Sequence, residues 1–276
     1  MAARPTWKGY LKISLVNIPV KVFPATDAAA TLSFNQLHAE CQTRIQQKRW
    51  CPSCQREVPN TDIVKGYEFE KGRYVVIDED DIDKVRVEST RVINLERFTD
   101  DTAIDPIYLE RPYYLAPDGP VAREAFAVIR EGMQGKAGIG KVALYGREYL
   151  VKVQPREQGL VMYTLRHAAE IRSMEAIDEL AEMPDKVKPE EVKLARQVMG
   201  TFEGTVDLQE YRDDYQVGLR EIIDAKIEGR EVVAPEVEAP PKVVNLMEAL
   251  RKSLDSIGKK PAAVSQMPAE KKRKRA

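Results

Sequence analysis

The sequence predicts an α+β fold that is mainly β, and two features of its pattern carry that prediction. Short runs of branched and aromatic residues recur over the first 110 residues, whereas apolar residues return at three- and four-residue spacing from Met174 onward. The 276 residues are 32% charged and 43% hydrophobic, enough to bury a core. Because no apolar run approaches the ~20 residues of a membrane helix and the start lacks an apolar signal core, we expect a cytoplasmic location.

The first two thirds of the chain should consist of strands and a single helix. The expected strands are Tyr10–Val16, Val20–Phe23, Ile63–Phe69, Arg73–Ile77, Lys84–Phe98, Ile107–Leu115, Lys141–Val153 and Leu160–Leu165. Asn17-Ile-Pro19 is interpreted as the turn between the first two strands, and Pro155–Gly159 as the turn joining the last two. One helix is expected over Gly119–Gln134, with an apolar face made of Val121, Ala125, Val128 and Ile129.

The remaining third is predicted to be helical and then extended. Helices are expected over Pro189–Gly200 and Leu208–Glu228, followed by a proline-containing linker over Glu231–Lys242. A short amphipathic helix over Val243–Leu254 carries an apolar stripe of Leu246, Met247, Leu250 and Leu254. Residues 258–276 are rich in Lys, Pro and Ala and are predicted to be disordered.

The formal net charge of −1 is the sum of opposed blocks. The net charge is +5 over residues 1–60, −7 over 61–110, +4 over 111–172, −9 over 173–258 and +6 over the last 18 residues. A fold with such blocks can hold a polyanion on one basic surface and repel it elsewhere. Ordinary solvated charge is the alternative interpretation.

All three cysteines lie within fourteen residues and close to one histidine. The pattern is His38-x2-Cys41, nine residues, then Cys51-Pro-Ser-Cys54. Two close pairs of soft ligands at this spacing are typical of a tetrahedral zinc site, and four protein ligands leave no open position for catalysis. The sequence therefore predicts a structural zinc, and buried free thiols with His38 packed nearby are the alternative.

Gly135-Lys-Ala-Gly-Ile-Gly-Lys141 imitates a phosphate-binding loop but fails in two ways. Val142 follows where a magnesium-binding Ser or Thr is required. The expected order of elements is helix, glycines and strand, whereas helix amides face a phosphate only after strand, glycines and helix. We therefore expect no nucleotide cofactor, and we interpret the glycines as allowing a tight crossing of the chain.

Basic side chains gather along the strands of the +4 block. They are Lys136, Lys141, Arg147, Lys152, Arg156, Arg166 and Arg172. Such a row binds a phosphate backbone without reading bases, although a solvated sheet face gives the same pattern. The terminal run Lys271, Lys272, Arg273, Lys274 and Arg275 adds salt-dependent, non-specific affinity. The acidic run Asp78–Asp81 is interpreted as a solvated turn or a helix cap.

Several short motifs occur in a fixed order along the chain: Trp7-Lys-Gly, Leu15–Val20, Ile63–Glu68, Tyr74-Val-Val, Arg111–Leu115 and Leu246–Leu250. In these motifs the chain resembles bacterial Ku proteins of the non-homologous end-joining pathway. The resemblance covers nearly the whole chain. It implies a β-barrel core with extended bridge arms, two copies of which close a ring around a DNA end.

The resemblance also implies partners and a division of the chain. Residues 1–230 would form the core, residues 231–257 the linker and the helix that recruits an ATP-dependent DNA ligase of the D type, and residues 258–276 the basic tail. The cations of the +4 block would line the ring in a homodimer bound to double-stranded DNA, which implies a DNA-repair protein near the nucleoid. The set of His38 and three cysteines occurs in only some bacterial relatives, so zinc would not be essential to ring function.

The sequence predicts no enzyme and no catalytic residues. Only two histidines are present, and no Ser-His-Asp set or paired-carboxylate motif stands out. Two other classes remain open: a zinc-containing enzyme of nucleic-acid metabolism, and a protein-interaction scaffold with a basic tail.

Overall fold

The computed structural model describes residues 4–27, 31–85, 91–144, 146–184 and 186–230, together with 247, 249–251 and 254. The chain divides into two compact units, Met1–Ser173 and Met174–Ala276. The first unit holds every β-strand assigned in the described part of the chain.

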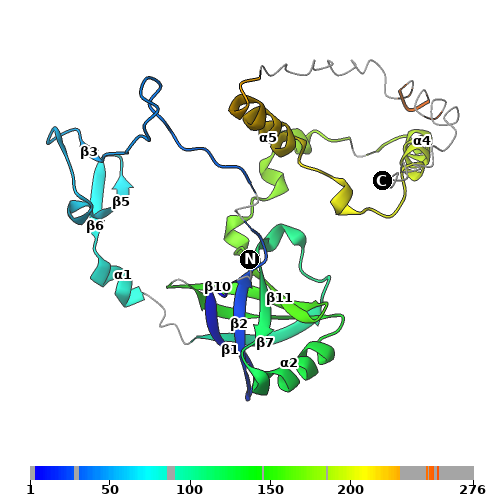
Figure 1. The fold of residues 1–276 in the computed structure, drawn as a ribbon. Coiled ribbons are helices and arrows are strands. Elements are labelled where there is room, and N and C mark those ends of the chain that lie inside the picture. Colours follow the sequence, from blue (N-terminus) through cyan, green and yellow to red (C-terminus); the bar gives the residue numbers. More distant parts are fainter. Residues whose placement is uncertain are drawn as a thin grey trace, which may run out of the picture. The chain divides into compact units, whose positions relative to one another are not determined.

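A closed seven-stranded barrel forms the centre of the first unit (Figure 1). Its strands are β1 (Trp7–Ile13), β2 (Val16–Pro24), β7 (Val92–Asp100), β8 (Leu109–Pro117), β9 (Lys136–Leu144), β10 (Arg147–Arg156) and β11 (Gly159–Leu165). Their order around the barrel is β1-β2-β8-β11-β10-β9-β7. The parallel pairing of β1 with β7 closes the barrel, and the other six neighbouring pairs are antiparallel. The β-barrel fold expected from the sequence is therefore confirmed.

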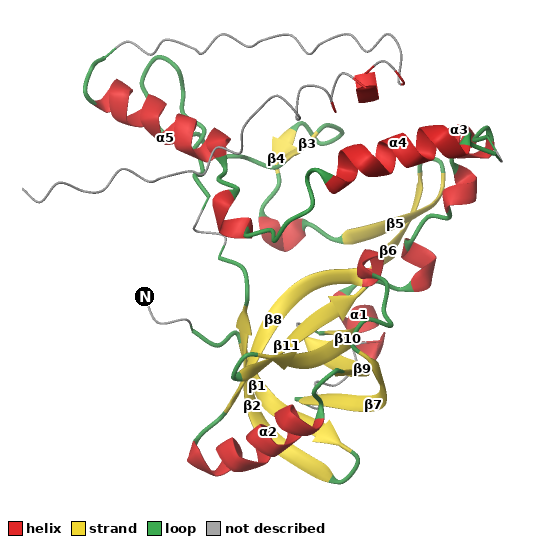
Figure 2. Cartoon of the chain, turned by 90° about the vertical axis from the view of Figure 1, so that its right-hand side faces the viewer, coloured by secondary structure: helices red, strands yellow, loops and turns green. Residues whose placement is uncertain are grey.

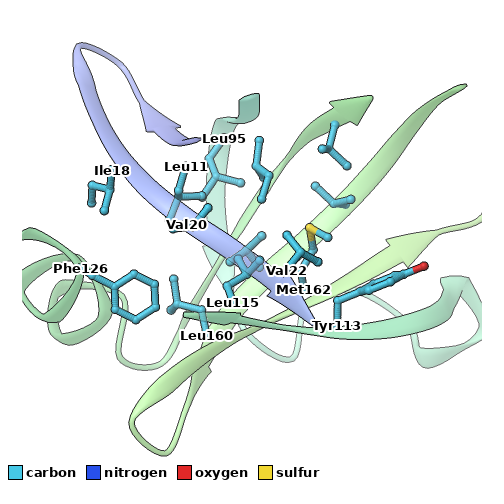
Figure 3. Close-up of a cluster of buried hydrophobic side chains, with 14 of the residues drawn as sticks. Leu11, Ile18, Val20, Val22, Leu95, Tyr113, Leu115, Phe126, Leu160 and Met162 are labelled. Carbon is cyan, nitrogen blue, oxygen red and sulfur yellow. The ribbon is translucent and has the colours of Figure 1, made fainter. Parts of the chain in front are cut away.

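The hydrophobic core fills this barrel and extends under one helix, α2 (Pro120–Gly132). Figure 3 shows strand residues such as Val22, Leu115 and Leu160 gathered inside, with Phe126 of α2 lying beside them. Phe126 is only 3% exposed, so α2 closes an apolar gap that would otherwise face water.

The apolar face predicted for this helix was partly wrong. Val121 is 94% exposed, Val128 is 65% exposed and Ala125 is exposed too, whereas Ala122 and Phe126 are buried. Ile129 packs against the core, as expected. The helix is thus rotated so that the aromatic ring of Phe126 covers the barrel, and burying this ring removes a large apolar area from water.

Glycines permit the close approach of β7 and β9. A Cβ added at Gly140 would lie 1.9 Å from the main-chain oxygen of Asn94, and one at Gly138 would lie 2.6 Å from Leu95 Cδ1. The predicted role of these glycines in a tight crossing is confirmed. The helix precedes the strand as predicted, but only Gly135 lies between them, and Gly138 and Gly140 are inside β9. The expected strand Lys141–Val153 is two strands, β9 and β10, which turn at Gly146 with φ of 80°.

The turn predicted at Asn17-Ile-Pro19 was wrong. The chain turns at Ser14 and Leu15, where Ser14 has φ of 54°, and Pro19 lies inside β2 opposite Tyr10. The Pro19 carbonyl accepts a hydrogen bond of 2.9 Å from the Asp118 amide, just beyond the β2–β8 ladder. The N–H and C=O groups of one strand residue point to the same side, which for Pro19 is the side of β8. Pro19 lies beyond the last paired residue of β2 in the β2–β8 ladder, so its missing N–H removes no ladder hydrogen bond.

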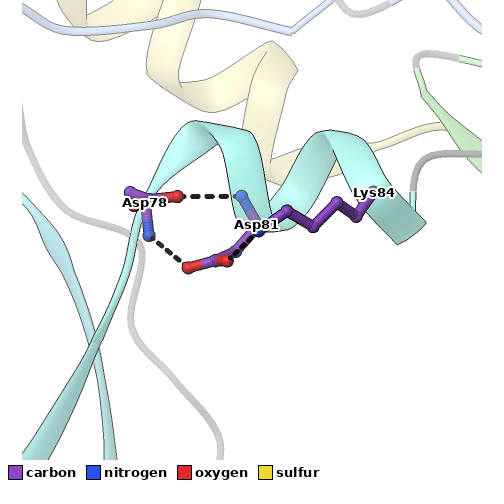
Figure 4. A network of polar contacts seen from close by, with 3 residues as sticks. All are labelled: Asp78, Asp81 and Lys84. Atoms are coloured by element: carbon purple, nitrogen blue, oxygen red, sulfur yellow. Dashed lines mark hydrogen bonds and ion pairs between the residues drawn. The ribbon is translucent and has the colours of Figure 1, made fainter.

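The strand predicted over Lys84–Phe98 is only partly a strand. Helix α1 (Glu79–Val85) comes first, and β7 begins at Val92. Asp78 accepts a hydrogen bond of 2.8 Å from the Asp81 amide at the helix start, and Lys84 Nζ lies 2.8 Å from Asp81 Oδ1 (Figure 4). The Lys84 hydrogen bond, followed by that of the Asp78 amide to Asp81 Oδ2 at 3.4 Å, lowers the pKa of Asp81. The interpretation of the acidic run as a helix cap is confirmed.

Two small hairpins lie between β2 and α1 in the sequence. They pair β3 (Trp50–Cys51) with β4 (Arg56–Glu57), and β5 (Lys65–Glu70) with β6 (Arg73–Ile77). Single 3₁₀ turns occur at Asn60–Asp62, Pro106–Tyr108, Ala168–Glu170, Met174–Ala176 and Leu208–Glu210.

The second unit is helical, as predicted from its periodicity. Its helices are α3 (Asp178–Ala181), α4 (Pro189–Gly200) and α5 (Asp214–Ile227), drawn in red in Figure 2. The last begins six residues later than expected, because Asp213 accepts a hydrogen bond from the Gln216 amide and caps α5 there. No helix in the described ranges is long and apolar enough to cross a membrane.

Candidate nucleic-acid interface

A row of polar and basic residues crosses three strands on the outer side of the barrel. Lys12 of β1 pairs with Asn94 of β7, and Asn94 pairs in turn with Lys141 of β9. Partners in neighbouring strands project to the same side of a sheet, so the two lysines share one face about 10 Å apart. Leu11, next to Lys12, is fully buried and identifies the opposite side as the interior.

A second basic pair lies on the neighbouring strands β1 and β2. Lys8 and Lys21 are directly opposed in the ladder. Between them Asp118 accepts from Lys21 at 2.7 Å and lies 3.9 Å from Lys8. The Lys21 hydrogen bond lowers the pKa of Asp118. One carboxylate thus offsets part of the repulsion between two ammonium groups, and the site keeps a net positive charge.

Sequence reasoning missed Lys8, Lys12 and Lys21 as interface candidates. Their signal was present as the alternation of lysine with buried apolar residues in Trp7–Ile13 and Val16–Pro24, within the +5 block. Their place beside Lys141 depends on the parallel β1–β7 pairing, which joins residues about eighty positions apart and leaves no local pattern.

Three of the predicted cations are held by carboxylates. Lys136 hydrogen-bonds Asp100 at 2.5 Å, Lys141 lies 2.8 Å from Glu148, and Arg166 lies 3.9 Å from Glu110. The hydrogen bond with Asp100 raises the pKa of Lys136, and that with Glu148 raises the pKa of Lys141. These lysines remain charged at neutral pH, and a phosphate has to compete with their partners.

Lys152 is placed where a DNA phosphate cannot reach it. Its side chain alternates with the buried Val151 and Val153, so it leaves the barrel on the outer side. There it is only 4% exposed, and its Nζ donates to the main-chain oxygen of Asp101 at 2.5 Å. The prediction of Lys152 as a DNA contact is therefore wrong, because its ammonium group is covered and hydrogen-bonded to the main chain of the barrel unit.

The other three predicted cations, Arg147, Arg156 and Arg172, are exposed and form no ion pair within the described ranges. Arg147 lies over the Tyr149 ring at 5.9 Å, beside a cavity of about 220 Å³ that Glu110, Glu148 and Glu170 also line. Arg156 ends β10 at the turn into β11. The structure thus leaves Arg156 and Arg172 as the predicted cations with the fewest competing contacts.

The predicted metal ligands lie on two turns. His38 Nδ1 is 3.2 Å from Cys41 Sγ, and Cys51 and Cys54 hydrogen-bond each other. No three metal-binding side chains converge on one point among the residues whose placement is described.

The predicted ligase helix and the basic tail are covered only in part. Met247, Leu250 and Leu254 are helical and half-buried. Leu246 and the run Lys271 to Arg275 lie outside the described residues.

Comparison with known proteins identifies the family. The family model described as the Ku70/Ku80 beta-barrel domain matches residues 12–195, which include β2 and all five later barrel strands. The chain belongs to the Ku family. Bacterial and archaeal Ku proteins named "Non-homologous end joining protein Ku" are similar over most of this chain. The protein of Acidobacterium capsulatum is 41% identical over 261 residues, covering 91% of this chain and 85% of the relative.

Two further Ku relatives extend the match across nearly their whole length. The protein of Heliobacterium modesticaldum is 35% identical, with 93% of each chain covered. That of Archaeoglobus fulgidus is 34% identical, with 92% of this chain and 99% of the relative covered. The similarity to Ku therefore includes both the barrel and the helical unit that follows it.

Proposed function

We propose that this Ku chain binds the ends of double-stranded DNA in non-homologous end joining. The observation that carries the proposal is the similarity to proteins of that name over more than nine tenths of the chain. The barrel supports it with outward cations on β1, β2, β9 and β10, such as Lys12 and Arg156.

The proposed recognition is electrostatic and indifferent to sequence. Lysine and arginine on a sheet surface meet phosphates, and each neutralised phosphate releases counterions to the solvent. Contacts to phosphate carry no sequence information, so the affinity should depend on salt and hardly on the bases. The function proposed is binding rather than catalysis.

Dimerisation is proposed from the β5–β6 hairpin. Register places Tyr67 and Val75 on one face, and Tyr74 and Val76 on the other. All four are between 45% and 66% exposed. A two-stranded hairpin with apolar residues on both faces is marginal by itself in water. We propose that a second copy of this chain covers it, so that two chains close a ring which a DNA end threads.

The partner proposed for the C-terminal region is an ATP-dependent DNA ligase of the D type. Met247, Leu250 and Leu254 are apolar residues at helical spacing that remain half-buried. An apolar helical stripe of this kind suits a groove on a partner protein.

A comparison of linear and covalently closed circular DNA of equal sequence tests the proposal. Titration at moderate salt should give tighter binding to the linear form, because a closed ring can load only at a free end. Light scattering should give the mass of two chains in the free protein and on a short duplex. Equal affinity for both DNA forms, or a single chain on the duplex, would contradict threading.

A nuclease and a scaffold give other results in the same assay. A nuclease would shorten one of the DNA forms when magnesium is added. A scaffold with a basic tail would bind both forms weakly and lose that binding when residues 259–276 are removed.

A further inference from the structure

Residues 36–58 contain the same hairpin twice. In the first copy the Ile45 amide donates to the Gln36 carbonyl at 2.9 Å. In the second, thirteen residues later, the Val58 amide donates to the Arg49 carbonyl at the same distance. The next residues inward are also paired in both copies, as Leu37 with Arg44 and Trp50 with Glu57.

The potential metal ligands occupy the same positions in both copies. His38 and Cys41 become Cys51 and Cys54 under the thirteen-residue shift. The residue after the second ligand is left-handed in each copy, with φ of 54° at Gln42 and 49° at Gln55. That conformation costs a non-glycine residue about 1–2 kcal/mol, so its repetition indicates a shared turn that sets the two ligands side by side.

The ligand atoms within each pair are close enough to share one ion. His38 Nδ1 and Cys41 Sγ are 3.2 Å apart. Tetrahedral bonds of about 2.0 Å to nitrogen and 2.3 Å to sulfur separate the two donor atoms by roughly 3.5 Å. The thiols of Cys51 and Cys54 are likewise in hydrogen-bond contact. Each turn therefore presents half of a tetrahedral site.

The two hairpins have no hydrophobic core of their own. Every residue from Ser33 to Trp50 is exposed, including Phe34 at 67% and Leu37 at 52%. A segment this small with so little buried area needs a cross-link or a metal to hold one conformation. Its cysteines are free thiols in the structure, and a metal bound by them would supply such a link.

We propose that His38, Cys41, Cys51 and Cys54 bind one zinc ion and thereby fasten the two hairpins together. The described side chains do not yet surround a single point, so binding has to bring the second pair to the first, with residues 46–48 as the connection. Four protein ligands fill a tetrahedral shell and exclude a bound water, so the ion is structural.

Metal analysis of the full-length protein, purified with reductant and without chelator, tests the site. We expect about one zinc per chain in the wild type. Cys41→Ser and Cys51→Ser should each lose most of it, and His167→Ala, which changes the only other histidine, should keep it. Replacement by cobalt should give the absorption of a tetrahedral cobalt thiolate in the wild type and lose it in both serine variants.

Trypsin supplies a second readout that does not depend on metal content. Arg44, Arg49 and Arg56 lie within the repeated hairpins, and Lys48 lies in the connection between them. Zinc should protect these bonds, and a chelator should open them while the barrel keeps its thermal unfolding transition. Less than about a tenth of an equivalent of zinc in the wild type would overturn the proposal. Full zinc in Cys51→Ser with an intact barrel would also overturn it.

Discussion

Lys152 Nζ donates to the main-chain oxygen of Asp101, linking the middle of β10 to the loop after β7. The contact is local to the barrel wall, and the lysine is almost fully covered. A residue that resembles a DNA contact in the sequence is thus part of the packing. This difference between a buried and an exposed cation can be measured.

Lys152→Met and Arg156→Gln should separate stability from DNA affinity. Loss of the hydrogen bond should lower the free energy of unfolding of Lys152→Met by about 1–3 kcal/mol, with unchanged DNA binding per folded molecule. Arg156→Gln should leave stability within about 0.5 kcal/mol of the wild type. If Arg156 contacts a phosphate, the slope of the logarithm of the DNA-binding constant against the logarithm of the salt concentration should be smaller by about 0.9 in Arg156→Gln. Denaturant titration and salt-dependent binding check both, and the opposite pattern would contradict this assignment.

Gly140→Ala should destabilise the barrel by several kcal/mol. The added Cβ would meet the Asn94 main-chain oxygen at 1.9 Å, which forces β7 and β9 apart. Gly218→Ala is the matched control, because nothing lies within 4 Å of a Cβ there and alanine favours helix α5 by about 1 kcal/mol. Thermal unfolding of both variants measures the contrast. A Gly140→Ala protein as stable as the wild type would show that the two strands are less closely packed.

The Asp100–Lys136 ion pair should stabilise the fold at intermediate pH and lose this effect at both low and high pH. Lys136 lowers the pKa of Asp100, so this stabilisation is complete above about pH 4 and is lost as pH falls through the folded-state pKa. Asp100 raises the pKa of Lys136, so the stabilisation is complete below about pH 10 and is lost as pH rises through the folded-state pKa.

NMR titration of the Asp100 carboxyl checks the pair. In Lys136→Gln the Asp100 pKa should move up toward its ordinary value. Lys71→Gln, in the exposed turn between β5 and β6, should leave it unchanged. Asp100→Asn should strengthen DNA binding at low salt if Lys136 faces phosphate, because the lysine loses its competing carboxylate.

Charges on the β5–β6 hairpin should prevent dimerisation. Tyr67→Glu and Val76→Glu place a carboxylate on opposite faces of the hairpin, where burial by a second chain would be unfavourable. Light scattering should give a single-chain mass for whichever variant carries its new carboxylate on the hairpin face that the second chain covers. That variant should also bind linear DNA more weakly. Glu68→Gln is the control. Retention of the two-chain mass by both glutamate variants would place the dimer contact elsewhere.

Leu250→Glu should reduce association with a D-type ligase without affecting DNA binding. Leu250 is half-buried, and a carboxylate in an apolar groove pays a desolvation cost of several kcal/mol. Arg251→Gln, next to it and exposed, should bind the ligase normally. Calorimetric titration of the purified proteins measures both. Equal affinity of wild type and Leu250→Glu would exclude this helix as the contact.

Local patterns predicted the parts of the fold that depend on neighbours in sequence. Alternation gave most strands, and the Asp78 cap and the helix from Pro189 to Gly200 were identified because capping and helical periodicity act within one or two turns. The turn at Ser14 was missed because Pro19 resembles a turn residue wherever its missing N–H is not yet placed.

The sequence by itself determined the family, the mainly β first unit, the helical second unit and the repeated spacing of His38, Cys41, Cys51 and Cys54. Only the tertiary structure decided which cations are available. Lys12 shares a face with Lys141 because the parallel pairing of β1 with β7 places Asn94 between them. Lys152 instead donates to the main chain of Asp101, which is distant in the sequence. The physical reason is that exposure and charge pairing depend on segments distant in the chain, which no local period records.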